Sequence, residues 1–195
     1  MPAWMQRVMV CVLLAMARWV GATPITTLFN TGVDANGQPA AHGTADQHCT
    51  LISAPTGSSL NTRVIDPSGG LPFPFYDVGS NASRWVLADN AVPTVGSVSP
   101  TGDFTFRTAF DLTGNVAGMA SISGNWRVDN FGVQFLLNGV ALPSVALPIA
   151  FNNLPVNNFY PGAPLFGSSI SGGVVAGINT LDFVVQNFDG IGVGR

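Results

Sequence analysis

The sequence predicts an all-β fold, an antiparallel sandwich or barrel, on three observations. Hydrophobic residues make up 47% of the 195 residues, while charged residues make up only 9%. The chain holds 23 Gly and 14 Pro but neither Lys nor Glu, which usually fill exposed helical faces. Short segments alternate apolar and polar residues with the period of a half-buried strand, and turn-forming residues separate them. Strands of this length and spacing are typical of antiparallel sandwiches and barrels.

The N-terminus has the pattern of a secretory signal peptide. Arg7 precedes an apolar run over residues 8–17, and small residues follow before position 23. The run is shorter than the ~20 residues that cross a bilayer, and Arg18 ends it. We expect residues 1–22 to be removed and residues 23–195 to form one secreted domain, outside the cell or at the envelope surface, without a membrane span.

The charge and cysteine content of the mature chain argue against nucleic-acid binding and against a disulfide within the chain. Removing the leader takes two of the seven arginines and leaves all ten aspartates, for a net charge of −5. That balance offers no basic patch for a phosphate backbone, so nucleic-acid binding is not expected. Cys49 remains as a single cysteine and cannot form a disulfide within the chain. We expect a small buried hydrophobic side chain, with pairing between molecules as the alternative.

Four strands are predicted before residue 100. Each is a short apolar segment bounded by turn-forming residues. They cover residues 25–29, 48–53, 62–65 and 84–88.

The strongest alternation begins at residue 103. In segment 103–112, Phe110 and two other phenylalanines share one side, and Arg107 falls on the other. Segment 121–128 repeats the pattern and places Trp126 on its apolar side. We therefore expect the ring of Trp126 in the core.

Two further strands are predicted in the C-terminal half. Segment 133–137 ends in Asn138-Gly139, which suits a tight hairpin turn because both residues tolerate positive φ. Segment 181–187 alternates again. The Pro- and Asn-rich stretch 141–164 is predicted to form long loops with one short strand, and such loops often carry binding sites.

Three charged residues fall on the polar sides of these segments. They are Arg107, Arg127 and Asp182. If their strands are neighbours, we expect exposed cross-strand ion pairs, each worth less than ~1 kcal/mol.

Motifs spread over most of the mature chain carry a family resemblance. They lie at residues 29–34, 46–51, 102–108, 110–114, 120–124, 126–130, 137–139 and 177–187. Together they resemble the passenger domain of exported bacterial PEP-CTERM proteins. The second half is also similar to the galactose-binding-like jelly roll, in which a strand ending in Asn-Gly and a late Gly-x-Asn-x-Leu strand recur.

The resemblance implies a jelly-roll β-sandwich linked to exopolysaccharide or the cell envelope, and no defined activity. Two features depart from the family. Cys49 stands where an aromatic residue is usual, and the chain ends at Arg195 without the Pro-Glu-Pro motif, membrane helix and arginine cluster of the sorting signal. The chain is either a truncated passenger or a relative released to the outside, so the resemblance does not carry the membrane anchor over to it.

Catalytic patterns are weak in this sequence. It contains no Gly-x-Ser-x-Gly nucleophile motif. His48 and Cys49 are neighbours on a predicted strand, so their side chains point to opposite faces and a Cys–His dyad is not expected. Asp103 and Asp111 share one side of a strand but lie ~26 Å apart, too far for the carboxylate pair of a glycosidase. We do not expect an enzyme.

A calcium site is the nearest approach to a metal motif. Asp34 and Asn36 begin like a calcium loop, but Ala45 occupies the twelfth position, where a bidentate Glu belongs, and Asp46 follows. With Asp129 these residues supply hard oxygen donors, which select Ca²⁺ over Zn²⁺. The four are candidate ligands of one structural calcium ion. The alternative is that they close turns through their own backbone.

Ligand binding is predicted at aromatic residues in Pro-rich loops. An aromatic ring can support the C–H face of a sugar while an amide holds its hydroxyls. The candidates are Phe75, Tyr76, Trp85, Tyr160 and Asn130. The alternative is that these rings close the end of the sandwich.

These observations predict a secreted, non-catalytic extracellular module associated with exopolysaccharide or another envelope glycan. One alternative is a secreted polysaccharide hydrolase, which requires a cleft with two aspartates within about 10 Å. Another is a matrix protein that assembles through strand edges, which lack the lysines that commonly protect them.

Overall fold

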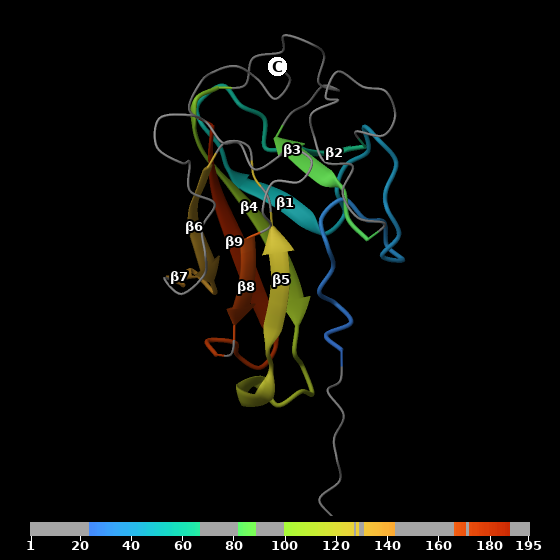
Figure 1. Cartoon of the computed structure of the whole chain (residues 1–195), viewed down its shortest axis with the longest axis vertical. Coiled ribbons are helices and arrows are strands. Elements are labelled where there is room, and N and C mark those ends of the chain that lie inside the picture. Colours follow the sequence, from blue (N-terminus) through green and yellow to red (C-terminus); the bar gives the residue numbers. More distant parts are fainter. Residues whose placement is uncertain are drawn as a thin grey trace, which may run out of the picture.

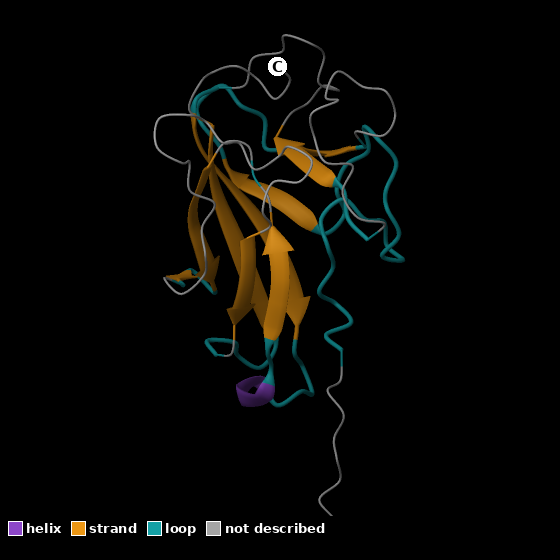
Figure 2. Ribbon diagram, viewed as in Figure 1, coloured by secondary structure: helices purple, strands orange, loops and turns teal. Residues whose placement is uncertain are grey.

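The computed structural model describes residues 24–66, 82–88, 100–126, 128, 131–142, 166–170 and 172–187. These residues form antiparallel strands and one short 3-10 turn (Figures 1 and 2). The elements are β1 (Cys49–Ser53), β2 (Thr62–Ile65), β3 (Trp85–Ala88), β4 (Gly102–Asp111), η2 (Ala117–Met119), β5 (Ile122–Trp126), β6 (Phe131–Leu137), β7 (Val140–Ala141), β8 (Phe166–Ile170) and β9 (Ile178–Asn187). The predicted all-β antiparallel architecture is confirmed.

The largest sheet has the strand order β1-β4-β9-β6-β7. Strands β4 and β9 lie side by side within it and pair along their whole length, from Gly102 opposite Asn187 to Asp111 opposite Ile178. Two further pairs, β2-β3 and β5-β8, complete the described sheets. Long segments far apart in sequence therefore build the centre of the fold.

The core lies on one face of this sheet. Phe135 and Phe183 meet edge to face, with ring centroids 4.6 Å apart. Ile122 of β5 and Ile170 of β8 pack into the same cluster, and Figure 1 shows this pair of strands beside the large sheet. The buried members of the cluster are Phe110, Leu112, Phe135, Leu137, Ile170 and Leu181.

Strand β4 confirms the predicted alternation over residues 103–112. Phe104, Thr108 and Phe110 are buried, whereas Asp103 and Ala109 are exposed. A strand with one apolar face buries that face against the core and leaves the other to solvent or to a second layer.

The predicted hairpin turn at Asn138-Gly139 is also confirmed. Asn138 has φ 53° and Gly139 has φ 77°, the left-handed values that a tight two-residue turn requires. The backbone N–H of Leu142 donates to the carbonyl of Phe135 (2.9 Å), which continues the pairing beyond β7.

The predicted strand at 25–29 is wrong. The backbone N–H of Leu28 donates to the carbonyl of Ile25 (3.1 Å), so the segment turns. A turn brings two apolar side chains three residues apart to the same side, and both pack against the core cluster. Burial of these two side chains outweighs the strand preference of the segment.

Strand β8 was not predicted. Its sequence, FGSSI, contains no apolar alternation of its own. It forms as the partner of β5, with Ser123 opposite Ser169 and Ile122 opposite Ile170.

Several predictions lie outside the described residues. These are the loops and short strand within 143–164 and the side chains of Trp126 and Arg127. Within the described part of the chain, no helix has the length and apolarity needed to span a bilayer.

Candidate functional site

Asp46 is a buried carboxylate that joins an N-terminal loop to the start of β1. Its Oδ2 accepts a hydrogen bond from the N–H of Gly32 (2.6 Å). Its Oδ1 accepts from the N–H groups of His48 (2.8 Å) and Cys49 (2.9 Å). Both carboxylate oxygens of this candidate calcium ligand therefore already accept hydrogen bonds from the backbone.

Gly32 is required at this contact. Its φ of +68° is a left-handed value, and a Cβ there would lie 2.4 Å from the Cβ of Arg84. The missing side chain lets the loop approach β3 closely enough for the Gly32 N–H to reach Asp46.

Asp34 closes a turn through its own backbone, as the alternative interpretation of the calcium motif stated. Its Oδ1 accepts from the N–H groups of Gln38 (2.9 Å) and Asn36 (2.8 Å). These two hydrogen bonds stabilise the ionised carboxylate and hold the pKa of Asp34 below its ordinary value, and the bond from Gln38 has the larger effect.

The structure brings Asp34, Asn36 and Asp46 into one loop region, while Asp129 lies outside the described residues. Among the residues that are described, no group of three or more His, Cys, Asp or Glu side chains is placed to hold a metal ion. A calcium ion bound with the help of Asp129 stays a prediction.

Cys49 is buried as a free thiol, as predicted. Burial, reinforced by the Asp46 carboxylate, raises the pKa of its thiol to about 12. The neighbouring His48 ring stacks on Phe29 with centroids 3.8 Å apart, and its Nε2 donates to the carbonyl of Asp34 (2.9 Å). These contacts are structural.

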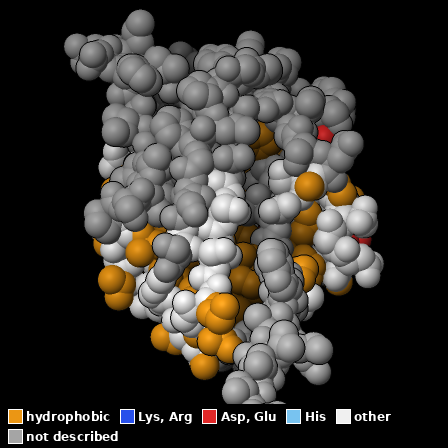
Figure 3. All heavy atoms as spheres, turned by 60° about the horizontal axis from the view of Figure 1, so that its bottom comes forward, with side chains coloured by type: hydrophobic (Ala, Val, Ile, Leu, Met, Phe, Trp, Pro, Cys, Tyr) orange, Lys and Arg blue, Asp and Glu red, His pale blue; other side chains and the backbone are white. Residues whose placement is uncertain are grey.

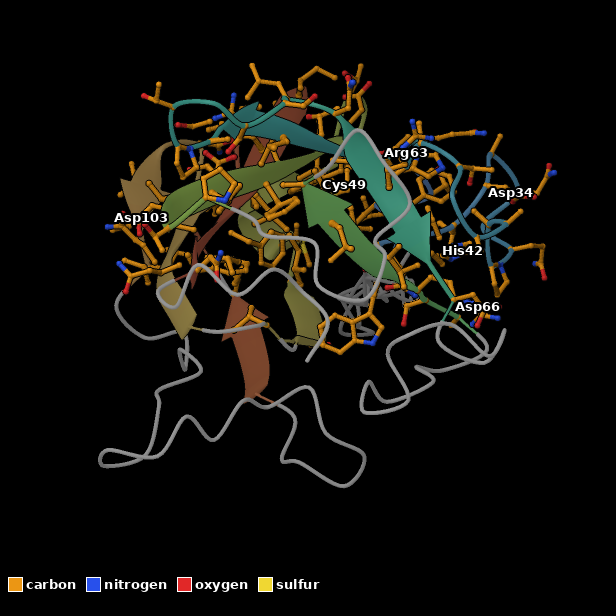
Figure 4. All side chains as sticks on the ribbon, turned by 90° about the horizontal axis from the view of Figure 1, so that it is seen from above. Asp34, His42, Cys49, Arg63, Asp66 and Asp103 are labelled. Carbon is orange, nitrogen blue, oxygen red and sulfur yellow. The ribbon has the colours of Figure 1, made fainter. Side chains whose placement is uncertain are left out.

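Polar side chains continue beside this loop at the ends of β2 and β3. Figure 4 shows Asp34, His42, Arg63 and Asp66 on the same side of the molecule. Arg63 donates to the carbonyl of Gly43 (2.7 Å), and the N–H of Asp66 donates to Nδ1 of His42 (3.3 Å). The Asp66 carboxylate lies 3.5 Å from Nε of Arg84.

Trp85 is the one candidate ligand residue that the described chain contains. It begins β3, pairs with Ile65 and is half-buried. The others, Phe75, Tyr76, Asn130 and Tyr160, lie outside the described residues. Their grouping around a ligand stays a prediction.

The face of the large sheet opposite the core carries a bidentate ion pair. Arg107 and Asp182 are directly opposite in register, with Nε–Oδ1 at 2.6 Å and Nη2–Oδ2 at 2.7 Å. These hydrogen bonds raise the pKa of Arg107 above its ordinary value.

The predicted pairing is thus correct, but the expectation of an exposed pair is wrong. The Asp182 side chain is only 5% exposed, against 36% for Arg107. Asp182 lies on a central strand, with Arg107 beside it on β4 and Leu136 beside it on β6. Neighbours on both sides cover a short side chain that would be exposed on an edge strand.

The same sheet face presents further hydrogen-bonding groups. Thr50 on β1 is opposite Arg107, and Thr105 lies two residues along β4. Gln186 donates from Nε2 to the carboxylate of Asp103 (3.0 Å). Sequence reasoning missed this surface, although the polar positions of the alternating strands could have identified it.

Two asparagines from separate motifs of the resemblance meet at one end of the sheet. Asn138 donates from Nδ2 to Oδ1 of Asn179 (2.9 Å). The fully buried Asn179 also accepts from the N–H of Val175 and donates to the carbonyls of Val175 and Gly177. These two motif residues hold turns together.

The six described aspartates all have structural partners. Asp111, for example, accepts from both the N–H and the hydroxyl of Thr113, which holds its pKa below the ordinary value. The others are Asp34, Asp46, Asp66, Asp103 and Asp182. In comparisons with known proteins, this chain matches no family model, no curated protein and no solved structure.

Proposed function

We propose that this protein is a secreted, non-catalytic β-sandwich of jelly-roll, galactose-binding-like type that binds extracellular polysaccharide or another envelope glycan. The packing of Ile122 and Ile170, from the β5-β8 pair, against the core cluster of the large sheet supports a sandwich, in which two sheets share one core.

Two features favour binding over catalysis. A general acid or base needs a carboxylate that is available to the substrate, whereas the described aspartates hold backbone or side-chain donors. A nucleophilic cysteine needs a lowered pKa, and the pKa of Cys49 is raised to about 12.

The observation that carries the proposal is the polar face of the large sheet. The ion pair uses the Nε and Nη2 groups of Arg107, so its Nη1 hydrogens lie outside that pair. Asp182 fixes the guanidinium and balances its charge, while Thr50, Thr105 and Gln186 add hydroxyl and amide groups. Such fixed donors, together with the carboxylate oxygens of Asp103 and Asp182 as acceptors, suit the hydroxyls of a sugar chain.

The test is retention of the mature chain on a panel of insoluble polysaccharides, with and without chelator. We expect retention on at least one neutral polysaccharide. Gln186→Ala weakens that retention about 3- to 10-fold, because one hydrogen-bonding side chain is lost. Gln38→Ala, which removes an exposed glutamine from the N-terminal loop, leaves it unchanged.

Other outcomes separate the alternatives. Loss of retention in Trp85→Ala but not in Gln186→Ala moves the site to the β3 loops. Loss on chelation identifies a calcium-dependent site. Release of reducing ends by the wild-type chain replaces the proposal with a hydrolase, and no retention on any polysaccharide removes it.

A further inference from the structure

The chain contains two Asn-Gly dipeptides in described turns. They are Asn36-Gly37 in the N-terminal loop and Asn138-Gly139 between β6 and β7. Gly37 and Gly139 have nearly the same left-handed φ, 75° and 77°. Both asparagines are exposed, so neither the local sequence nor the exposure distinguishes the two turns. The hydrogen bonds of their side chains do distinguish them.

The side-chain amide of Asn138 is held through both of its polar atoms. Its Nδ2 donates to the carbonyl of Gly173 (3.1 Å) and to Oδ1 of Asn179 (2.9 Å). Its Oδ1 accepts from the backbone N–H of Thr180 (2.9 Å). Because Asn179 is fully buried, moving this amide would also leave a buried polar group without a partner. The amide of Asn138 therefore cannot turn without breaking three hydrogen bonds.

The side-chain amide of Asn36 is held much less firmly. It hydrogen-bonds the carboxylate of Asp34, and none of the described donors binds its Oδ1. The backbone N–H of Gly37 donates to the carbonyl of Asp34 (3.0 Å), a single turn bond in an exposed loop. The loop lies at the right of Figure 1, and Figure 3 shows acidic and other polar groups at the surface on that side. Turn bonds of this kind open locally at little cost in free energy.

We propose that Asn36 is a modification site, at which the folded chain converts this asparagine to aspartate and isoaspartate without an enzyme. When the turn opens, the backbone nitrogen of Gly37, which no Cβ shields, attacks Cγ of Asn36. The new N–Cγ bond closes a succinimide ring, the Cγ–Nδ2 bond breaks, and ammonia leaves with the proton of the attacking nitrogen. Water then opens the ring at either carbonyl and leaves one carboxylate, so no other reactant is needed.

The turn itself requires the glycine but not the amide of Asn36. Residue 37 has a left-handed φ, so any other side chain there is strained. Asn36 supplies the turn with its backbone N–H, which donates to Oδ1 of Asp34 (2.8 Å). The reactive amide can therefore be replaced without removing that hydrogen bond, and the conversion can be tested in a folded variant.

Conversion changes a turn that helps to hold the N-terminal loop together. Oδ1 of Asp34 accepts from the N–H of Gln38 (2.9 Å), and its carbonyl accepts from Nε2 of His48 (2.9 Å). Isoaspartate adds one methylene to the backbone of this turn, and either product places a second carboxylate two residues from Asp34. We expect the loop to loosen and the pKa of Asp34 to rise, because a nearby like charge disfavours ionisation. The conversion does not depend on glycan binding.

The first test follows both dipeptides by peptide mass spectrometry while residues 23–195 age in mildly alkaline buffer. We expect Asn36 to convert at least roughly 10-fold faster than Asn138, because three hydrogen bonds must break before Asn138 can react. In urea the two sites should convert at similar rates, since unfolding removes the bonds that separate them. Equal rates in the folded chain, or the same ratio of rates in urea, overturn the proposal.

The second test reads the charge of the intact chain by anion exchange. The aged wild type should develop a more acidic species, because each conversion replaces a neutral amide by a carboxylate. Asn36→Gln, whose extra methylene moves the amide carbon away from the nitrogen of Gly37, should lose most of that species. Asn115→Gln, at an exposed asparagine followed by a β-branched residue, should keep it. In the aged wild type, NMR titration should show a raised pKa for Asp34 and an unchanged one for Asp111. An equal acidic species in Asn36→Gln, or an unchanged pKa of Asp34 after conversion, contradicts the proposal.

Discussion

Two buried polar side chains perform the same task in different regions of the molecule, with different chemistry. Asp46 holds the N-terminal loops to β1 by accepting three backbone N–H groups. Asn179 holds the loop before β9 by accepting two N–H groups and donating to two carbonyls. A carboxylate suits a site that offers donors only, whereas an amide suits one that offers both donors and acceptors.

The largest effect is expected at Asp46. Asp46→Ala leaves three N–H groups near the buried carboxylate position without an acceptor, and should destabilise the protein by about 3–5 kcal/mol. Urea unfolding of the variant measures this cost. Asp103→Ala, at an exposed carboxylate, is the control. A loss below about 1 kcal/mol at Asp46 would contradict the role assigned to it.

Asn179→Asp tests whether the second site needs an amide, because it replaces the Nδ2 donor by an oxygen. The new oxygen faces the carbonyls of Val175 and Gly177, which the amide had donated to. We expect a loss of about 2–4 kcal/mol in urea unfolding. Asn115→Asp, an exposed asparagine in a neighbouring loop, should unfold as wild type. Equal stability of the two variants would show that Asn179 is not matched to its site.

The Arg107–Asp182 pair is a third kind of polar anchor, a half-exposed cation on a buried carboxylate. Arg107→Met leaves Asp182 without its cation, and we expect a loss of about 1–2 kcal/mol because Arg107 is partly exposed to water. A double-mutant cycle with Asp182→Asn isolates the interaction between the two side chains. A coupling energy near zero would reduce the pair to two independent surface groups.

Cys49 makes the Asp46 region sensitive to alkaline pH. Its folded pKa of about 12 lies above the ordinary value of 9.0, so the unfolded chain releases the thiol proton first. The contribution to stability is complete below about pH 9 and is lost progressively toward pH 12. Stability measured against pH should fall less steeply in this range for Cys49→Ala. Rapid alkylation of the folded wild type at pH 8 would argue against a buried thiol.

The smallest effects are expected at two aspartates in turns, one in each region. The pKa values of Asp34 and Asp111 are lowered, so their contribution to stability is present above the ordinary pKa and is lost as the pH falls through the folded one. NMR titration should give both carboxyl groups pKa values below 3.8. Thr113→Val should raise the pKa of Asp111 and leave that of Asp34 unchanged. A shift of both would mean that the turns are coupled.

Most strands could be predicted because alternation is a local property of the sequence. The strands at 48–53, 62–65, 84–88 and 133–137 needed only apolar residues at the right period and turn residues around them. Strand β8 could not be predicted from FGSSI, because its pairing with β5 supplies what its own composition lacks. The turn at Ile25 was missed because burial of Ile25 and Leu28 against a distant core decided it.

The candidate site followed the same division. The two-residue alternation of the strands placed Arg107 and Asp182 on the polar sides, so their pairing could be predicted. The burial of Asp182 could not. The Asx turn of Asp34 was one of two local alternatives, while the three donors of Asp46 come partly from a loop fourteen residues away.

The sequence by itself determined the strand periodicity, the Asn138-Gly139 turn and the acidic, lysine-free character of the chain, because each depends on neighbouring residues or on composition. The tertiary structure decided which polar groups are buried and what they hold. Asp46, Asn179 and Asp182 look alike in the sequence as polar residues, and they differ only in the donors, acceptors and cation that the folded chain brings to them from far along the sequence.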